Sequence, residues 1–219
     1  MAREFTAASS QYLSVPDSST LDITGQLTVA CWAKSSGSYS ANRGLVSKYG
    51  LEGSQRSYVI YIDGLGFVAF ALSTNGTFQS ANVLTGSTAI GTDWSHIAGV
   101  VTPNVRQEIF LNANSAAVKT SGVLASIHSG TAPLWIGAQF LIGTSTIFDG
   151  LIAEVGIWNA ALTTAEVASL AKGMSCDKVR PQSLVFYAPL VRELIDQKGG
   201  LTITNNNGAT AATHPRIYP

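Results

Sequence analysis

The side chains best suited to hydrolytic chemistry are the thirteen Asp and Glu residues. Hydrolysis of a glycosidic bond needs two carboxyl groups that flank the bond, about 5–5.5 Å apart in retaining enzymes. Because same-face neighbours on a strand are two residues apart, such a pair favours acidic residues at positions i and i+2. The sequence has no acidic pair at that spacing, and Glu108 and Glu154 are isolated in apolar runs. A glycoside hydrolase is therefore the least favoured function, although carboxylates far apart in sequence can meet in a fold.

Histidine is the other side chain that could act as a general base, and the chain has three. His96 lies in the apolar run DWSHIAGVV, a context typical of a buried histidine. His128 and His214 lie in loop-like segments without a Ser or Cys in a nucleophile turn nearby. The Gly-rich loop and lysine of a phosphate-binding site are also absent from the sequence. These features predict that the protein is not an enzyme.

Binding of a sugar requires exposed aromatic rings beside polar hydrogen-bonding groups. Tyr39, Tyr49 and Phe78 lie in or beside predicted loops, so they are the candidate ligand-binding residues. The four tryptophans fall in apolar runs and are expected in the core: Trp32, Trp94, Trp135 and Trp158. The zero net charge leaves no basic surplus for nucleic acid. No apolar run approaches the roughly 18 residues of a membrane span, and the first ten residues lack a signal-peptide core, so neither nucleic acid nor membrane is an expected partner.

Short runs rich in β-branched and aromatic residues, separated by Gly, Asn, Ser and Asp, would position these side chains. They predict strands at 11–16, 27–35, 44–49, 57–63, 67–73, 77–83, 94–102, 108–113, 116–120, 133–138, 151–159 and 183–190. This pattern predicts an all-β fold, a two-sheet antiparallel jelly-roll sandwich. The runs at 57–63 and 67–73 are apolar on both faces, so a loop, a helix or another subunit should cover their outer side.

One short helix is expected after the strand at 151–159. Thr163 and Glu166 have the spacing of a capping box, Val167 and Leu170 would form its buried face, and Gly173 is a natural C-terminal stop. The helix would span about two to three turns, which suits a plug at one end of the sandwich.

Six segments in sequence order resemble laminin-G-like, concanavalin A-like jelly-roll domains, a group that includes the pentraxins. They are FTAASSQYLSVPDSSTLDITGQLTVACWAKS, RGLVSKYG, DWSHIAGVV, IFLNANS, LWIGA and FDGLIAEVGIWNAALTTAEV, which together cover roughly residues 5–172. The resemblance implies the sandwich and its closing helix. It also makes structural calcium a candidate, with Asp149 in the F-D-G position as the first ligand to check. Turn carboxylates such as Asp63, Asp93 and Asp149 could instead close their own loops. We expect no required cofactor.

The sequence divides into a sandwich and a tail. Residues 1–202, including the late strand near 183–190, are predicted as the laminin-G-like domain. Residues 203–219 are predicted as an extended C-terminal arm, because His214 and Tyr218 each precede a proline, which disfavours helix. The arm could complete the same sandwich or dock on a neighbouring subunit, with His214, Arg216 and Tyr218 as the docking residues.

The leading hypothesis from sequence is a non-catalytic structural or adhesion protein, a phage virion surface component such as a capsid decoration or fibre-like protein. The ending resembles laminin-G-like proteins of phage genomes. The 12% charged residues, the missing export signal and the arm suit assembly with protein subunits in a host cytoplasm. The alternative is a lectin-like carbohydrate-binding module, assisted by calcium, with surface glycans as partners. The ligand and the oligomeric state stay open.

Overall fold

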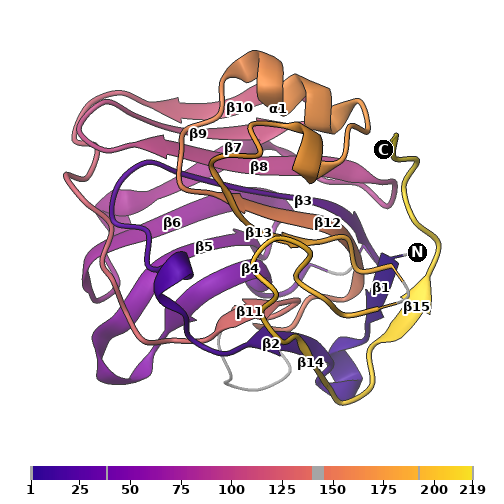
Figure 1. Ribbon diagram of the computed structural model, residues 1–219. Helices are drawn as coiled ribbons and strands as arrows, with labels where there is room; N and C mark the ends of the chain where they lie inside the picture. The colour runs from indigo at the N-terminus through magenta and orange to yellow at the C-terminus, as the bar shows by residue number, and fades with distance from the viewer. Residues whose placement is uncertain (1, 38, 140–145, 192, 219) are drawn as a thin grey trace.

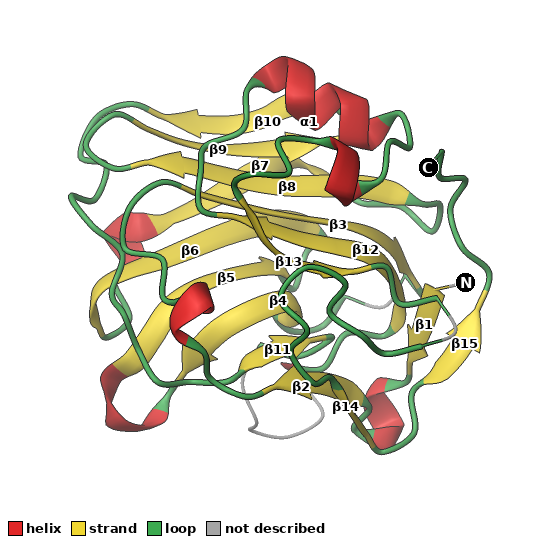
Figure 2. Cartoon of the chain, viewed as in Figure 1, coloured by secondary structure: helices red, strands yellow, loops and turns green. Residues whose placement is uncertain are grey.

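Two antiparallel sheets face each other across an apolar core (Figures 1 and 2). The computed structural model describes residues 2–37, 39–139, 146–191 and 193–218. Within these residues the larger sheet has eight strands, and the smaller sheet has seven. The predicted two-sheet sandwich is therefore confirmed.

The larger sheet runs in the order β10 (Asn114–Lys119), β9 (Arg106–Leu111), β8 (Ser95–Thr102), β3 (Leu27–Ser35), β12 (Gly150–Trp158), β1 (Ala2–Phe5) and β15 (Thr210–Ala212), with β13 (Leu184–Ala188) also paired to β12. The smaller sheet runs in the order β14 (Thr204–Asn206), β2 (Tyr12–Val15), β11 (Leu134–Ile136), β4 (Arg43–Gly50), β5 (Gln55–Ile62), β6 (Phe67–Gly76) and β7 (Val83–Ala89). Short 3-10 turns lie between strands: η1 (Ala7–Ser9), η2 (Ser19–Leu21), η3 (Glu52–Ser54), η4 (Ser80–Asn82) and η6 (Cys176–Lys178).

Alternation along the strands builds the core. In β3, Leu27, Val29 and Cys31 are fully buried between the sheets, whereas Ala30 belongs to a separate cluster on the outer face. The predicted strand at 77–83 is wrong, because β6 continues to Gly76 and a polar turn precedes β7. Gln79 Oε1 accepts hydrogen bonds from the Thr74 N–H and hydroxyl, both at 2.9 Å. These bonds close the chain into a turn at the residues where the sequence predicted an extended strand.

The helix α1 (Thr164–Ala171) has the predicted capping box, since the Glu166 N–H donates to Thr163 Oγ1 at 3.3 Å and the Thr163 N–H donates to Glu166 Oε2 at 2.7 Å. Its predicted position as an end plug is wrong. Val167 and Leu170 pack on an apolar cluster with Val100, on the outer face of the larger sheet (Figure 1). This face needs a cover because β8, β9, β12 and β13 present apolar side chains outward as well as inward.

The outer side of the smaller sheet is also buried, as the two-sided apolar runs predict. Tyr49, Val59, Tyr61, Ala69 and Ala71 form a cluster there with at most 8% of each residue exposed. Close to this cluster, the segment after β11 lies directly on β4 at Gly44. Within the described residues, no helix has the length and apolar character that a membrane span requires.

Gly44 permits this close approach, and its replacement by alanine is expected to destabilise the fold. A Cβ at this position would lie 2.1 Å from the backbone carbon of Ala138 and from the backbone nitrogen of Gln139. Because backbone atoms cannot rotate away, we expect Gly44→Ala to lower the free energy of unfolding by about 1–3 kcal/mol in urea titrations. Gly25→Ala is the control, since a Cβ there meets no atom within 4 Å. Equal midpoints for the two variants would contradict the predicted close packing.

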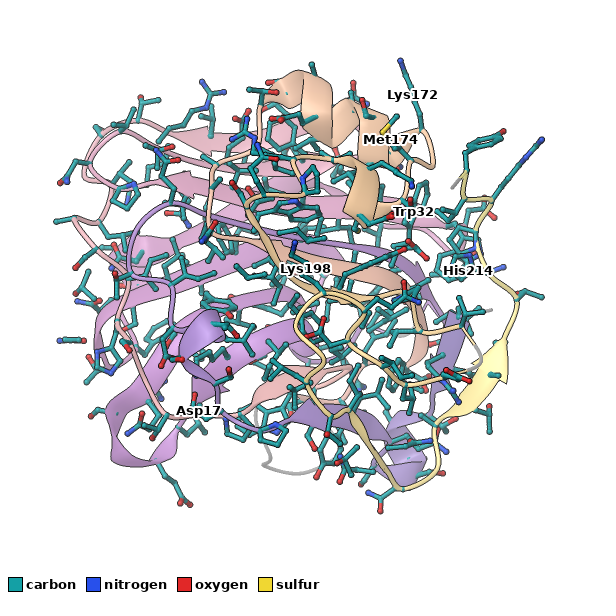
Figure 3. All side chains as sticks on the ribbon, in the orientation of Figure 1. Asp17, Trp32, Lys172, Met174, Lys198 and His214 are labelled. Atoms are coloured by element: carbon teal, nitrogen blue, oxygen red, sulfur yellow. The ribbon has the colours of Figure 1, made fainter. Side chains whose placement is uncertain are left out.

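Residues after 202 pair within their own chain, which is one of the two alternatives that the sequence left open for the C-terminal segment. The strand β14 pairs with β2 in the smaller sheet, and β15 pairs with β1 in the larger sheet. The predicted boundary at residue 202 therefore does not divide sheet from arm, because residues after it complete both sheets of the same chain. His214 lies on the extended segment that follows β15 (Figure 3).

Candidate functional site

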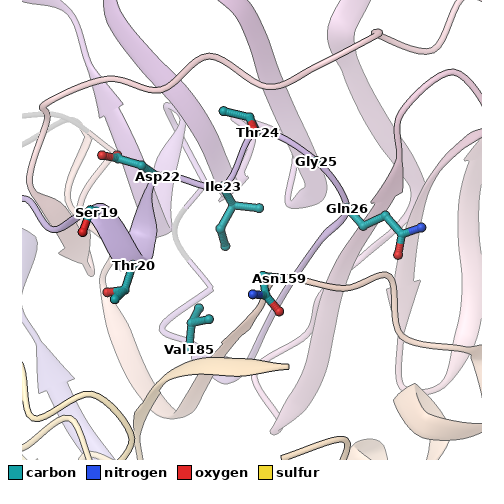
Figure 4. A pocket seen from close by; sticks show the side chains of 9 residues that line it. All are labelled: Ser19, Thr20, Asp22, Ile23, Thr24, Gly25, Gln26, Asn159 and Val185. Atoms are coloured by element: carbon teal, nitrogen blue, oxygen red, sulfur yellow. The ribbon is translucent and has the colours of Figure 1, made fainter. Parts of the chain in front are cut away.

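A polar pocket of about 380 Å³ lies beside η2, and we call it the η2 pocket (Figure 4). One wall is the segment from η2 to the start of β3, and the other is formed where β12 ends and β13 begins. Hydroxyl, amide and carboxylate groups line the walls above two aliphatic side chains: Ser19, Thr20, Asp22, Ile23, Thr24, Gly25, Gln26, Asn159 and Val185.

The alternation of buried and exposed residues from Leu21 to Thr24 sets the direction of the side chains on the first wall. Leu21 and Ile23 are buried in the core, whereas Thr24 is exposed and the Asp22 side chain is 23% exposed. The Tyr58 hydroxyl donates to the Leu21 carbonyl at 3.2 Å. Across the pocket, Gln26 Oε1 accepts from the Ala161 N–H at 3.3 Å, and the Asn159 N–H donates to the Ser183 carbonyl at 2.9 Å. The walls are therefore held by the fold before any ligand arrives.

A buried lysine sits behind the Asp22 carboxylate. Lys48 is fully buried, and its Nζ donates to Asp17 Oδ1 at 2.5 Å, to the Gly130 carbonyl at 2.7 Å and to the Ala132 carbonyl at 2.8 Å. These three contacts use all three protons of an ammonium group. Asp22 Oδ1 lies 3.1 Å from the same nitrogen but receives no hydrogen bond. Oδ1 is thus buried against the lysine, and Oδ2 is the oxygen that stays open as an acceptor, on a side chain that is 23% exposed.

Residues 7–168 match the family profile described as the Concanavalin A-like lectin/glucanases superfamily. The chain belongs to this superfamily. The match covers β2 to β12 and most of α1, so it includes both walls of the η2 pocket except Val185. No curated protein sequence matches the chain.

Several solved structures have a similar fold at low sequence identity. A candidate carbohydrate-binding protein from Bacteroides ovatus has a TM-score of 0.71 and 19% identity over 99% of this chain. The chain spans only 61% of the length of that protein. The match to a pentraxin from Limulus polyphemus has a TM-score of 0.57 and 16% identity, and it covers 91% of this chain and 93% of the pentraxin. The CBM40 domain of a Ruminococcus gnavus IT-sialidase, solved with α2,3-sialyllactose, has a TM-score of 0.59 and 18% identity over 78% of this chain and 96% of its own.

Three glutamates outside the η2 pocket make structural contacts. Glu108 accepts from Arg106 Nε at 2.7 Å and from the Ser115 hydroxyl at 2.5 Å. Glu154 accepts from the Tyr187 hydroxyl at 2.6 Å. Arg180 holds Glu166 through two hydrogen bonds of 2.8 and 2.6 Å, which together with the capping box lower the pKa of Glu166 despite the opposing effect of burial.

The aromatic residues predicted to bind sugar do not converge. Tyr49 is only 2% exposed, so its predicted role as a stacking surface is wrong, and burial raises the pKa of its hydroxyl to about 12. Tyr39 is half-buried and donates to the Ile90 carbonyl at 2.9 Å. Phe78 is 57% exposed but lies in the turn between β6 and β7. Among the residues that the structure describes, none of these three aromatic side chains lines a pocket.

The predicted calcium residue closes loops in this structure. Asp149 Oδ1 accepts from the Ala7 N–H at 3.1 Å, and Oδ2 accepts from the Ser36 hydroxyl at 2.8 Å. Asp63 likewise accepts from the N–H groups of Leu65 and Phe67, both at 2.9 Å, across the β5–β6 turn. Among the described residues, no group of three or more His, Cys, Asp or Glu could hold a metal ion. Calcium at Asp149 stays a prediction.

Buried aromatic groups follow the sequence expectation in part. Trp135 and Trp158 are buried, whereas Trp32 and Trp94 are half-buried. The expected buried histidine is confirmed, because His96 is 1% exposed and packs edge-on against Trp32 with ring centroids 5.4 Å apart. Burial lowers the pKa of His96 to about 3, so the ring is neutral at ordinary pH and cannot serve as a base with a pKa near neutrality.

All three predicted docking residues contact their own chain. His214 Nε2 lies 3.1 Å from Glu154 Oε1, and the Tyr218 N–H donates to the Gly173 carbonyl at 2.6 Å. The guanidinium carbon of Arg216 lies 5.0 Å from the centre of the Tyr218 ring. Docking on a neighbouring subunit stays a prediction.

The sequence does not single out the η2 pocket. The available signal is the alternation of polar and apolar residues in STLDIT (19–24), which reads equally well as an ordinary edge segment. Asn159 and Asp22 are 137 positions apart, so only the fold brings them to the same pocket.

Proposed function

We propose that the protein is a non-catalytic carbohydrate-binding module and that a sugar occupies the η2 pocket. The observation that carries the proposal is the Asp22 carboxylate: Lys48 lies 3.1 Å from Oδ1, and Oδ2 has no hydrogen-bond partner among the described residues. A fixed carboxylate can accept hydrogen bonds from sugar hydroxyls, and charge assistance makes such bonds stronger than neutral ones.

The rest of the pocket complements a sugar. The side-chain amides of Gln26 and Asn159 can both donate and accept, as sugar hydroxyls do, and the side-chain amide of Asn159 has no partner among the described residues. Ile23 and Val185 offer apolar contact to the C–H groups of the ring. Pocket volumes of about 300–1,000 Å³ are usual for small ligands, and this one falls at the lower end, which suits one or two sugar units.

The structural relatives also support carbohydrate binding. They include the Bacteroides ovatus protein, the sialyllactose-bound CBM40 domain and domain 4 of an arabinanase from Geobacillus stearothermophilus in complex with arabinotriose. Hydrolysis is not part of the proposal, because Asp22 is the one carboxylate that lines this pocket among the described residues. Asp17, the nearest candidate for a second, is bound to Lys48.

A glycan array followed by calorimetric titration tests the proposal. We expect Asp22→Asn to weaken binding of the selected oligosaccharide by about tenfold to a hundredfold, since a hydrogen bond to a charged group contributes about 1.5–3 kcal/mol. Asn159→Ala should weaken it less. Asp93→Asn removes an exposed carboxylate outside the pocket and should leave affinity unchanged. Absence of any glycan ligand, or equal affinity for Asp22→Asn and the unaltered protein, would contradict the proposal.

The two other sequence hypotheses have their own tests. The virion role gains no support from the structural relatives, so it gives way to carbohydrate binding as the leading function. Presence of the protein in purified phage particles would revive it. Calcium assistance can be read from the same titration repeated with a chelator, where unchanged affinity would count against it.

A further inference from the structure

We infer a second binding pocket, at the C-terminal end of α1, that takes a glycan carrying an anionic group. The pocket measures about 290 Å³ and is lined by Ser169, Lys172, Met174, Lys178 and Tyr218. It shares no residue with the η2 pocket, so the inference goes beyond the proposed function and does not depend on it.

The fold builds this pocket through the backbone around Gly173. The Tyr218 N–H donates to the Gly173 carbonyl at 2.6 Å, and the Ser175 N–H donates to the Tyr218 carbonyl at 3.3 Å. Gly173 has a φ of +95°, and a Cβ there would lie 2.6 Å from the Arg216 carbonyl oxygen. A glycine is therefore needed both to end the helix and to let the C-terminal segment approach, because the Tyr218 ring lies against Gly173 and the Tyr218 backbone forms a bridge with Met174.

A second contact holds the segment that delivers Tyr218. His214 Nε2 lies 3.1 Å from Glu154 Oε1, and its Nδ1 lies 2.7 Å from the Pro215 carbonyl oxygen. Glu154 is in turn bound by the Tyr187 hydroxyl at 2.6 Å. The C-terminal segment is thus attached to β12 before it reaches α1, and the pocket wall is a fixed part of the fold.

Apolar surface is exposed on one side of the pocket. Tyr218 is 51% exposed and Met174 is 42% exposed, although both belong to residue types that are usually covered. An aromatic ring beside a thioether offers the contact that the C–H face of a sugar ring needs. A small inorganic anion would leave this surface uncovered.

Positively charged side chains also line this pocket. The Lys172 ammonium has no hydrogen bond or ion pair with any described residue. Lys178 contacts Asp177 at 3.5 Å, but both side chains are about half exposed, so this pair is weak. Arg216 lies 5.0 Å from the Tyr218 ring centre and adds a third cation nearby (Figure 3 shows Lys172 and Met174 together). In a chain of zero net charge, this local surplus favours a ligand with a carboxylate or a sulfate.

Titration with three purified oligosaccharides tests the inference: a carboxylated oligogalacturonate, a sulfated heparin fragment and a neutral cello-oligosaccharide. We expect one or both charged probes to bind at low ionic strength, more weakly as salt is added, while the neutral probe binds at least tenfold more weakly. The two charged probes separate a carboxylate ligand from a sulfate ligand. Equal binding of the neutral probe to the Asp22→Asn variant, in which the η2 pocket is impaired, or no binding of either charged probe, would overturn the inference.

Variants place the site. Lys172→Ala with Lys178→Ala should weaken binding of the charged probe about tenfold, and Tyr218→Ala should weaken it by a similar factor. Lys198→Ala and Phe78→Ala are the matched controls, since both residues are exposed and lie outside this pocket (Figure 3 labels Lys198). Asp22→Asn should have no effect, so failure of the proposed function is distinguishable from failure here. Because the lysines are exposed, the double variant should fold normally, and unchanged affinity would exclude this pocket.

Discussion

Replacing Lys48 by methionine is expected to lower the free energy of unfolding by about 3 kcal/mol or more. Methionine fills a similar volume but removes the charge that balances Asp17 and Asp22 and the donors that satisfy the Gly130 and Ala132 carbonyls. Removing one partner of a buried ion pair leaves uncompensated charge, which costs about 3–5 kcal/mol. The value should fall at the lower end, because the Asp17 and Asp22 side chains are 33% and 23% exposed and water can reach them. Urea unfolding measures the loss.

Two comparisons make this result specific. Adding Asp17→Asn and Asp22→Asn to Lys48→Met removes the unbalanced charges and should restore part of the stability. Lys198→Met, at an exposed position, should change the midpoint little. Lys48→Met should also weaken glycan binding in the η2 pocket, since Asp22 loses the group that fixes it. A stable Lys48→Met variant with unchanged glycan affinity would contradict both roles of this lysine.

Stability is expected to fall as pH drops below about 6.5, and His96 should be responsible for much of the fall. Burial lowers the pKa of His96 to about 3, from the ordinary histidine value of 6.5. Above pH 6.5 the ring is neutral in both the folded and the unfolded state, so its contribution to the free energy of unfolding is constant. Below pH 6.5 the histidine of the unfolded chain is protonated, whereas His96 in the folded protein stays neutral. The free energy of unfolding therefore drops by up to about 1.4 kcal/mol per pH unit until the pH approaches 3.

His96→Phe isolates this effect. Phenylalanine keeps an aromatic ring against Trp32 but cannot take up a proton. It also removes His96 Nδ1, a buried nitrogen without a hydrogen-bond partner, so the variant should be at least as stable as the unaltered protein at neutral pH. Acid titration of carboxylates affects both proteins alike, and the difference between their pH profiles therefore reports His96. Parallel profiles from pH 7 to about pH 4 would show that His96 does not carry the dependence.

Most of the fold could be predicted because its signals are local. The run at 27–35 coincides with β3, and the Thr163–Glu166 capping box marks where α1 begins. Alternation and caps are properties of residues a few positions apart, so they do not depend on how the rest of the chain folds. Four strands escaped prediction. β7 (Val83–Ala89) begins where the strand predicted at 77–83 would have ended. The other three, β1, β14 and β15, are three or four residues long and have no apolar run of their own. They exist because a neighbouring strand offers unpaired backbone groups.

The sequence by itself determined a β-sandwich with a capped helix, membership of its superfamily, and the lack of adjacent paired carboxylates. Only the tertiary structure decided which side chains face solvent and which groups meet. Tyr49 is buried because other segments cover the outer face of β4, and Lys48 finds the Gly130 carbonyl 82 positions away. The η2 pocket and the pocket at the C-terminal end of α1 each join segments from distant parts of the chain. Burial and long-range contacts depend on how loops cross the sheets, and local sequence patterns do not determine the course of these loops.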